Sequence, residues 1–494
     1  YDNFLEVFPT AGLYWKRYAE ACLEADDKAA TEAVLGRALR PKDTPNTDVP
    51  LCVFYIEFVM KVRLEPAMER MREVAQAFDF ALSQVGSAVG SFPLWRKYID
   101  FLKDAPASNL HEQQERRVAL RKAYHRVAGL AVHQVDVLWL EYKAFEEAES
   151  TSPQEAQQTV ATMQSNYATA IAAFKEKATV WGKLTLNLLA RPPDHRQSRV
   201  DEQVTLWQAA LSYEKRNPQR CGALFFAQHM RFVYAQCLSC LRHYPEIWLD
   251  LHRFEQNFGD LKKAHEVLEQ ALEVAPKSHL LCFAAADFFE AQGMPEKATS
   301  VFDETLRANP APLVYIMFQR FARRQADGMK AARKVFTRAR NSEHCSPEVF
   351  LASAHMELYA NRQPETARKV GRVVLEVGRK RYPEDAGFAA GVLDLLIPTV
   401  DDINTRVLFE NILSSLPAER SAPIWQRYLD FEHSKVLGGG GEAALASVAK
   451  LEERRQKALG EDAGYFTALQ STVHRYHCFG LAPSGPADVE FFRR

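Results

Sequence analysis

Large apolar residues recur along this chain at the spacing of one helix face. In the stretch WLEYKAFEE, residues 139–147, the side chains of Trp139, Tyr142 and Phe145 fall at i, i+3 and i+6. A carboxylate, Glu146, follows at i+7. Positions with this spacing line one face of an α-helix, whereas the alternation expected of a strand is not found over any useful length. The pattern predicts an all-α chain.

The same motif returns several times. Trp425, Tyr428 and Glu432 repeat it in full, and Trp248 with Glu255 keeps its two ends. The repeat anchors predicted on this basis are Trp15, Tyr18, Trp95, Tyr98, Trp139, Tyr142, Glu146, Trp207, Glu214, Trp248, Glu255, Trp425, Tyr428 and Glu432. Because the aromatic residues recur in every repeat instead of converging on one place, we predict that they pack the core rather than bind a ligand. For the same reason we expect the glutamates, including Glu290, to pair with neighbouring basic or hydroxyl groups rather than to act as general bases.

The anchors mark the first helix of each repeat. They stand at Trp15, Cys52, Trp95, Trp139, Trp207, Trp248, Cys282, Tyr315, Phe350, Phe388 and Trp425. Outside one gap, successive anchors lie 33 to 44 residues apart, which is the period of paired-helix repeats. A second helical segment follows each anchor, as in AHEVLEQAL at 264–272 and ARKVFTRAR at 332–340. The predicted fold is an α-solenoid of about eleven helical hairpins.

One interval breaks this period. Trp139 and Trp207 are 68 residues apart, and a long proline-free stretch runs from 155 to 191. We expect an unusually long second helix there, bent or interrupted near Gly182 and ended by Pro192.

Composition narrows the class of protein further. The chain has 494 residues, of which 47% are hydrophobic and 25% are charged, and its formal net charge is −1. This balance gives no overall attraction to nucleic acid or membrane. The chain contains no signal peptide and no 18-residue apolar run. Its eight cysteines lack regular spacing, which favours a reducing compartment. Since the chain begins at Tyr1 rather than Met, we expect it to be part of a longer protein.

Two short clusters have the residue types of a metal site. One is CLSC at 237–240 with His243, and the other is HRYH at 474–477 with Cys478. A structural zinc site would need a further pair of ligands, and there is no second CxxC, so a buried helix is the favoured interpretation of the first cluster. Phosphate-binding loops, GxSxG and HExxH are missing from the sequence as well. We therefore predict no enzyme, no metal and no cofactor.

Basic residues concentrate between 320 and 340. This basic strip has eight cations and one acid, Asp327. Its candidate contacts for RNA or an acidic partner are Arg320, Arg323, Arg324, Arg333, Lys334 and Arg338. Alternatively, these side chains solvate the outer face of second helices and pair with glutamates of first helices. No aromatic stacking platform is interleaved with them, which favours this second interpretation.

Longer stretches resemble a known family. Tryptophan, tyrosine three residues on and glutamate seven residues on, with a second helix of the ARxVFxRAL type, is the half-a-tetratricopeptide (HAT) pattern of RNA-processing scaffolds. Within that class, the chain resembles the suppressor-of-forked family of cleavage stimulation factor subunits. The stretches that carry the resemblance are FPTAGLYWKRYAEA at 8–21, AFDFALSQVG at 77–86, WRKYIDFL at 95–102, YEKRNP at 213–218, FVYAQCL and HYPEIW within 232–248, LVYIMFQRFARR at 313–324 and NTRVLFENIL at 404–413.

The resemblance implies a nuclear, non-catalytic scaffold of pre-mRNA 3′-end cleavage and polyadenylation. It implies an N-terminal HAT half at 1–241 with repeats 1–5. A C-terminal half at 242–494, with repeats 6–11 and a cap after Gly460, would form a homodimer. The implied partners are a second copy, other cleavage stimulation factor subunits and cleavage and polyadenylation specificity factors, with pre-mRNA bound indirectly and no membrane contact.

Two alternatives to this scaffold stay open. The first is a HAT scaffold of the spliceosome or of ribosomal RNA processing, because the same fold serves those assemblies. The second is a solenoid that binds RNA directly through the basic strip at 320–340.

Overall fold

The computed structural model describes residues 1–39, 46–63, 68–107, 109–150, 152–193, 198–360, 364–439 and 441–460. Within these ranges every regular element is helical, with α-helices α1 to α23 and one short 3-10 helix, η1 (Ile397–Thr399). The chain divides into two compact units, Tyr1–Ala285 and Ala286–Arg494, and the division falls within α14 (His279–Ala291).

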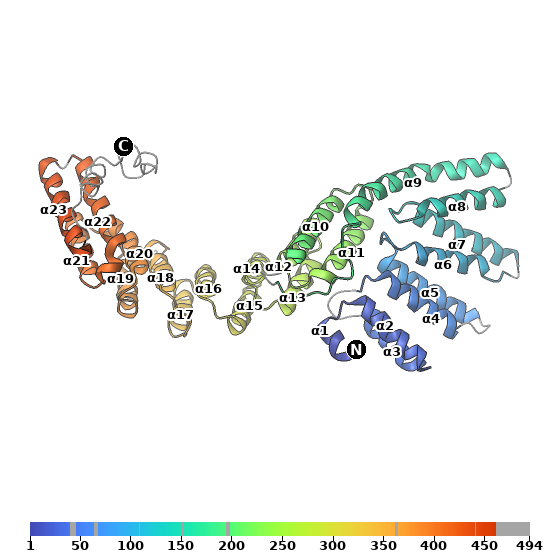
Figure 1. The fold of residues 1–494 in the computed structure, drawn as a ribbon, viewed down its shortest axis with the longest axis horizontal. Coiled ribbons are helices and arrows are strands. Elements are labelled where there is room, and N and C mark those ends of the chain that lie inside the picture. The colour runs from blue at the N-terminus through green and yellow to red at the C-terminus, as the bar shows by residue number, and fades with distance from the viewer. Residues whose placement is uncertain are drawn as a thin grey trace. The chain divides into compact units, whose positions relative to one another are not determined.

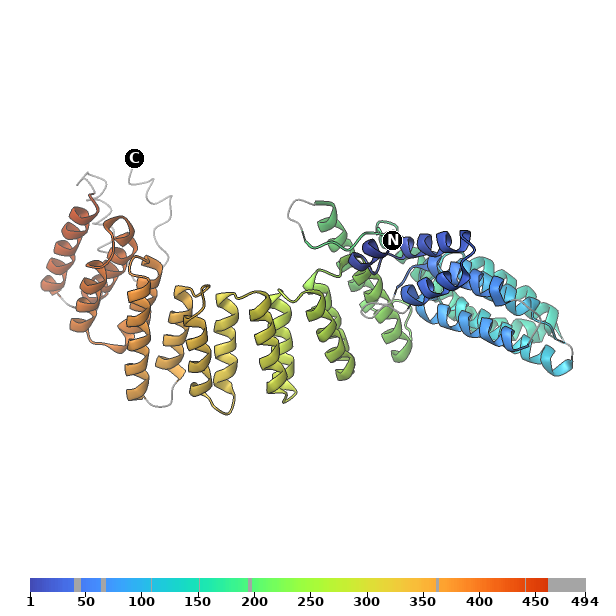
Figure 2. The same ribbon diagram turned by 90° about the horizontal axis from the view of Figure 1, so that it is seen from below.

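The helices after α1 (Asp2–Val7) form antiparallel pairs (Figures 1 and 2). In the first unit the pairs are α2 (Gly12–Glu24) with α3 (Lys28–Leu39), α4 (Val49–Arg63) with α5 (Met68–Val85), α6 (Phe92–Asp104) with α7 (Leu110–Ala128), α8 (Val135–Glu149) with α9 (Pro153–Trp181), α10 (Ser198–Lys215) with α11 (Ala223–Leu241), and α12 (Pro245–Phe258) with α13 (Leu261–Val274).

In the second unit α15 (Pro295–Ala308) packs against α16 (Pro312–Arg324). The pairs there are α16 with α17 (Met329–Arg340), α18 (Pro347–Ala360) with α19 (Pro364–Arg381), α20 (Ala386–Leu396) with α21 (Asp402–Leu413), and α22 (Ala418–Leu437) with α23 (Gly441–Leu459). Ten of the eleven anchors lie on the first helix of one of these pairs, and Cys282 lies on α14. The prediction of an all-α solenoid of helical hairpins is therefore confirmed.

Local sequence explains where the helices begin and end. Asn109, Ser152 and Asp260 each accept a hydrogen bond from the backbone N–H three residues on, which satisfies a donor at the helix start. Proline occupies the first turn of several helices, where its missing N–H costs nothing, as in α12 and α15. Gly259, with φ of +91°, ends α12 in a left-handed conformation that suits glycine.

The second helix of the fourth pair is unusually long, as predicted, but it ends earlier than predicted. Helix α9 has 29 residues and stops at Trp181, with Gly182 at its C-cap, so the predicted continuation to Pro192 is wrong. Residues after Gly182 turn back against α11, where the thiol of Cys240 contacts the carbonyl oxygen of Leu186 at 3.3 Å. The helix thus ends at Gly182, where the sequence predicts a bend or an interruption, and not at Pro192.

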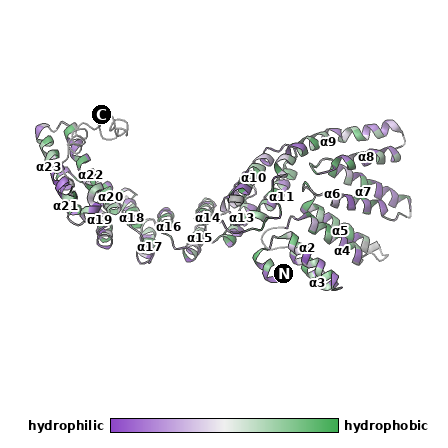
Figure 3. Ribbon diagram, viewed as in Figure 1, coloured by the Kyte–Doolittle hydropathy of each residue, from purple (hydrophilic) through white to green (hydrophobic). Residues whose placement is uncertain are grey.

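The core consists of side chains that the pairs bury between them. Trp95, Trp207 and Trp248 are at most 1% exposed, and Cys52 and Cys282, at the same position in their repeats, are fully buried. Figure 3 shows that the helices carry both hydrophobic and hydrophilic residues rather than being hydrophobic throughout. Such a helix buries one face only, so each hairpin depends on its neighbours for a complete core.

The boundary between the two compact units differs from the boundary between the two halves that the family resemblance implies. The contact boundary lies at Ala285/Ala286, whereas the resemblance implies halves at 1–241 and 242–494. The assignment of those halves to separate functions stays a prediction. The predicted cap after Gly460 and the HRYH cluster at 474–477 lie outside the described residues.

Candidate partner-binding surfaces

Buried glutamates connect neighbouring repeats. Four of them, Glu146, Glu255, Glu357 and Glu432, are at most 3% exposed and sit on the first helix of a pair. Each accepts two hydrogen bonds from an arginine on the second helix of the preceding pair. The pairs are Arg121 with Glu146, Arg231 with Glu255, Arg333 with Glu357 and Arg406 with Glu432, all with N···O distances of 2.6 to 3.0 Å. We call these four contacts the repeat latches.

Two-pronged contacts of this kind fix orientation as well as distance. A guanidinium that donates two parallel hydrogen bonds to a carboxylate restricts both groups to one plane. The four glutamates stand seven residues after Trp139, Trp248, Phe350 and Trp425. Glu357 had escaped the sequence motif because phenylalanine replaces tryptophan at its anchor. At these four junctions the latches restrict the orientation of one repeat relative to the next.

Glu290 departs from the latch geometry. It stands eight residues after Cys282 and is paired with Arg324 on the first helix of the next pair, with N···O distances of 2.8 and 2.5 Å. The shift by one residue turns the carboxylate to a different side of its helix.

A different cluster occupies the latch position beside the long helix. The carboxylate of Glu214 lies 2.6 Å from the ammonium group of Lys177 and 2.9 Å from Nε2 of His229. Burial opposes the charge on Glu214, but the hydrogen bond from His229 and the charge of Lys177 outweigh it, and the pKa falls to about 2. Burial lowers the pKa of His229 despite the neighbouring carboxylate. The cluster is thus a buried ion pair with a neutral histidine beside it.

The tryptophan anchors also hold the loops that precede their helices. The indole N–H of Trp15 donates to the carbonyl oxygen of Pro9 at 2.8 Å, and those of Trp95 and Trp248 donate to Gly86 and Arg242 at 2.9 and 2.7 Å. Tyr98 packs against Phe78 of the preceding pair, Tyr428 stacks on Phe409 of the preceding pair, and Tyr18 stacks on Tyr1. The hydroxyl of Tyr142 lies 2.8 Å from Nε2 of His125 on α7. These contacts are structural, since each links neighbouring segments of the solenoid.

The basic strip lies on α16 and α17, and four of its six candidate contact residues have partners within the chain. Arg333 forms a repeat latch, Arg324 pairs with Glu290, and Arg338 pairs with Asp303. Arg323 donates to the carbonyl oxygen of Ala360 at 2.5 Å. Arg320 and Lys334 are exposed, and neither forms an ion pair with the described part of the chain. Among the six candidate contacts, Arg320 and Lys334 are thus the exposed cations without an ion pair in the described residues, and the role of the strip in binding RNA or a partner stays a prediction.

The cysteine cluster on α11 has the properties of packed thiols. Cys237 and Cys240 are buried, and burial raises the pKa of Cys240 to about 12 and that of Cys237 above its usual range. Metal ligation requires the thiolate, which such burial disfavours. Across the described ranges, no three or more His, Cys, Asp or Glu side chains are grouped to hold a metal ion.

None of the described helices combines the length and the apolar character needed to cross a bilayer.

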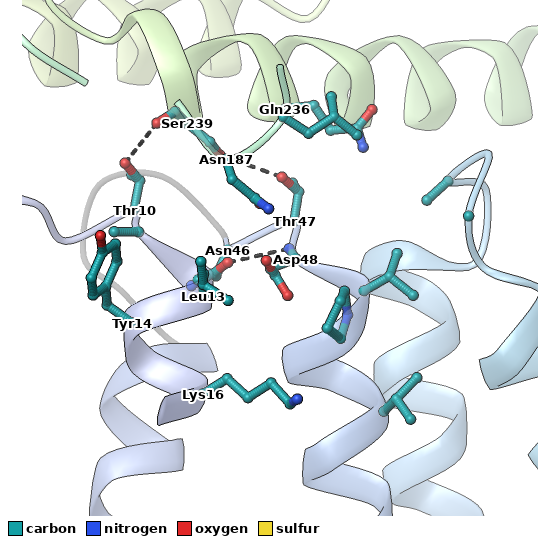
Figure 4. Close-up of a pocket in the computed structure, with 18 of the residues that line it drawn as sticks. Thr10, Leu13, Tyr14, Lys16, Asn46, Thr47, Asp48, Asn187, Gln236 and Ser239 are labelled. Carbon is teal, nitrogen blue, oxygen red and sulfur yellow. Dashed lines mark hydrogen bonds between the residues drawn. The ribbon is translucent and has the colours of Figure 1, made fainter. Parts of the chain in front are cut away.

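The first repeat contacts the fifth, which the sequence did not predict. Thr10 donates a hydrogen bond to the carbonyl oxygen of Ser239 at 2.8 Å, and the hydroxyl groups of Thr47 and Ser239 lie 3.3 Å apart (Figure 4). These partners are 229 and 192 residues apart in the chain. Repeat periodicity reports only on neighbouring hairpins, so it contains no signal for this closure of the first unit.

Comparison with known proteins agrees with the repeat architecture. The profile of the suppressor of forked protein (Suf) family matches residues 1–488. The chain is 34% identical over its whole length to cleavage stimulation factor subunit 77 of Arabidopsis thaliana, and 24% identical over 87% of its length to mRNA 3′-end-processing protein rna14 of Schizosaccharomyces pombe. It spans 65% and 63% of those two relatives.

A solved structure supports the fold separately. The crystal structure of CstF-77 superposes with a TM-score of 0.64 at 17% identity, over 96% of this chain and 91% of that one. At this identity the match bears on the fold alone, and that fold is a helical-repeat solenoid. Because the family profile covers nearly every residue and the repeats lie where its pattern predicts, the chain belongs to the suppressor of forked family.

Proposed function

We propose that this chain is the scaffold region of a subunit of the pre-mRNA 3′-end cleavage and polyadenylation machinery. The observation that carries the proposal is the match of the Suf family across residues 1–488, together with relatives whose names refer to cleavage stimulation and mRNA 3′-end processing. The chain would act in the nucleus by holding other processing factors in position. Its repeat latches support this role, because a scaffold must keep the spacing of its binding surfaces.

The partners proposed are a second copy of the chain, other cleavage stimulation factor subunits and the cleavage and polyadenylation specificity factors. We propose that the C-terminal half, 242–494, mediates the dimer. A solenoid exposes an apolar face at its last repeat, and a partner that covers this face stabilises the array. Light scattering over a range of protein concentrations tests the dimer, and a monomer at all concentrations contradicts it.

Affinity purification of the full-length protein from nuclear extract, followed by mass spectrometry, tests the assignment to this machinery. Recovery of cleavage and polyadenylation factors supports the proposal. Recovery of spliceosomal or ribosomal RNA-processing subunits alone assigns the scaffold to a different assembly and overturns it. A variant with Trp248→Ala serves as a control for folding, because loss of this buried anchor should reduce recovery of every partner together.

A further inference from the structure

A cavity of about 580 Å³ lies in the first unit beside the contact between the first and fifth repeats. It is bounded by the starts of α2 and α4, the turn before α6, the segment after α9 and one face of α11 (Figure 4). Its volume is in the range of sites that bind small molecules and short peptide segments.

One buried amide in the wall has an unused donor. The side chain of Asn46 is 3% exposed, and its Oδ1 accepts a hydrogen bond from the backbone N–H of Asp48 at 3.2 Å. That contact leaves Nδ2 as the free end, and Nδ2 has no hydrogen-bond partner in the described chain. A buried donor without an acceptor costs about 1–3 kcal/mol, so a ligand carbonyl oxygen that reached Nδ2 after a small rotation of this side chain would be stabilising. Gln236, which is 6% exposed, brings a second amide to the wall from α11.

The charged groups of the wall favour a basic ligand. Three acids, Glu20, Asp48 and Glu57, line the cavity with a single cation, Lys16. Lys16 is paired with Glu20 at 3.1 Å and Glu57 is paired with Lys97 at 2.9 Å, which leaves Asp48 as the acid of the wall that a ligand cation would meet. Asp48 accepts the backbone N–H of Leu51 at 2.8 Å but forms no ion pair within the described residues, and its burial raises its pKa. A cation next to Asp48 would offset that burial.

Apolar side chains form another part of the wall, and two of its segments lie close together. Val53, Phe54 and Trp181 form part of it, and Phe54 and Trp181 are less than 10% exposed. Gly12 allows the turn at 46–48 to approach α2, because a Cβ atom at Gly12 would lie 2.3 Å from Cβ of Asp48. The amide, the carboxylate and the apolar surface are thus held together in one place.

We propose that this cavity binds an extended peptide segment of a protein partner in which an apolar residue lies next to lysine or arginine. The backbone of such a segment supplies the carbonyl oxygen for Asn46, its cation pairs with Asp48, and its apolar side chain packs against the wall. The curvature of a solenoid creates extended concave surfaces that such proteins use for binding. RNA does not suit the cavity, since its lysine is already paired with Glu20 and the carboxylate of Asp48 repels phosphate groups. The proposal goes beyond a role in 3′-end processing and does not depend on it.

The test uses a phage library of random short peptides panned against the whole chain, with enriched peptides then measured by fluorescence polarisation. Asn187 is exposed, lines the cavity and lies beside Asn46 and Thr47 in Figure 4, so Asn187→Trp should fill the cavity without disturbing the core. Thr185→Trp places the same residue on the same segment outside the cavity and is the matched control. Circular dichroism establishes that each variant is folded.

We expect enriched peptides to combine basic and apolar residues and to lose at least tenfold affinity for Asn187→Trp but not for Thr185→Trp. Asp48→Asn keeps the helix cap and removes the charge, so it should weaken binding by about tenfold, and Asn46→Ala by about threefold to tenfold. Enriched peptides that bind Asn187→Trp as tightly as the natural chain overturn the proposal. Failure to enrich any peptide over a bare support, or enrichment of acidic peptides, overturns it as well.

Discussion

Arg333 on α17 donates two hydrogen bonds to the buried carboxylate of Glu357 on α18, at 2.6 and 2.9 Å. Arg333 belongs to the basic strip and, in the sequence, is equally suited to an RNA surface. In the folded chain its guanidinium group connects two repeats, and the same contact recurs at three other junctions. The arginine of the ARxVF motif is therefore a structural residue of the repeat. Four predictions test this and the neighbouring contacts.

The first prediction concerns the two sides of this latch. Arg333→Ala leaves the Glu357 carboxylate, 2% exposed, without its cation and should cost about 3–5 kcal/mol of unfolding free energy. Glu357→Ala leaves an arginine that water can reach and should cost about 1.5–3 kcal/mol. Urea denaturation measures both. The exposed residue Arg320 provides the control, since Arg320→Ala should change stability by less than about 0.5 kcal/mol. A larger loss for Glu357→Ala than for Arg333→Ala would contradict this assignment.

The second prediction separates binding from stability in the basic strip. If the strip binds RNA, charge reversal at the exposed residues Arg320 and Lys334 should weaken binding while the unfolding free energy stays nearly unchanged. Electrophoretic mobility with pre-mRNA fragments at two salt concentrations measures this, because phosphate-driven binding falls steeply with salt. Binding that survives both reversals and ignores salt would exclude a direct RNA-binding role for the strip.

The third prediction is the pH dependence of the Glu214 cluster. The pKa of Glu214 falls from 4.5 to about 2 on folding, so the unfolded chain takes up a proton first as pH drops. This contribution is fully present above pH 4.5 and lost towards pH 2, and it is on the order of 3 kcal/mol. His229 acts in the same direction from pH 6.5 downward, because its pKa is also lowered and the unfolded histidine protonates first.

The unfolding free energy of the natural chain should therefore decrease more between pH 7 and pH 3 than that of the variants Glu214→Gln and His229→Gln. Denaturation at a series of pH values measures this decrease. His229→Gln keeps a donor for Glu214 but does not titrate, so it should flatten the part of the curve just below pH 6.5. Parallel curves for the natural chain and both variants would show that the cluster does not control the acid sensitivity.

The fourth prediction concerns the contact between the first and fifth repeats. Thr10→Val removes the hydrogen bond to the Ser239 carbonyl oxygen with little change in side-chain size, and it should cost about 0.5–1.5 kcal/mol. Hydrogen exchange should accelerate in α2 more than in α8, which has no part in the contact. Thr159→Val on α9 is the control, since its hydroxyl is exposed and bonds only within its own helix. Equal acceleration in α2 and α8 would mean that the contact does not hold the first repeat.

The repeat architecture was readable in the sequence because it depends on local spacing. Trp139, Tyr142 and Glu146 share a helix face through the 3.6-residue period alone, and the return of that face every few tens of residues implies a stack of hairpins. The same spacing also located the latch glutamates, and it missed Glu357 only because its anchor is Phe350.

Only the tertiary structure showed which arginines pair with the latch glutamates. It also showed which segments from the two ends of the first unit meet. Arg333 and Lys334 are adjacent and alike in sequence, yet the helix turns one towards Glu357 and the other towards solvent. Asn46, Asp48 and Gln236 line one cavity because the curvature accumulated over five repeats returns the chain to its start. Small angles between repeats are set by packing throughout each interface, so the chain's local pattern determined the hairpins, and only their summed geometry decided which surfaces meet.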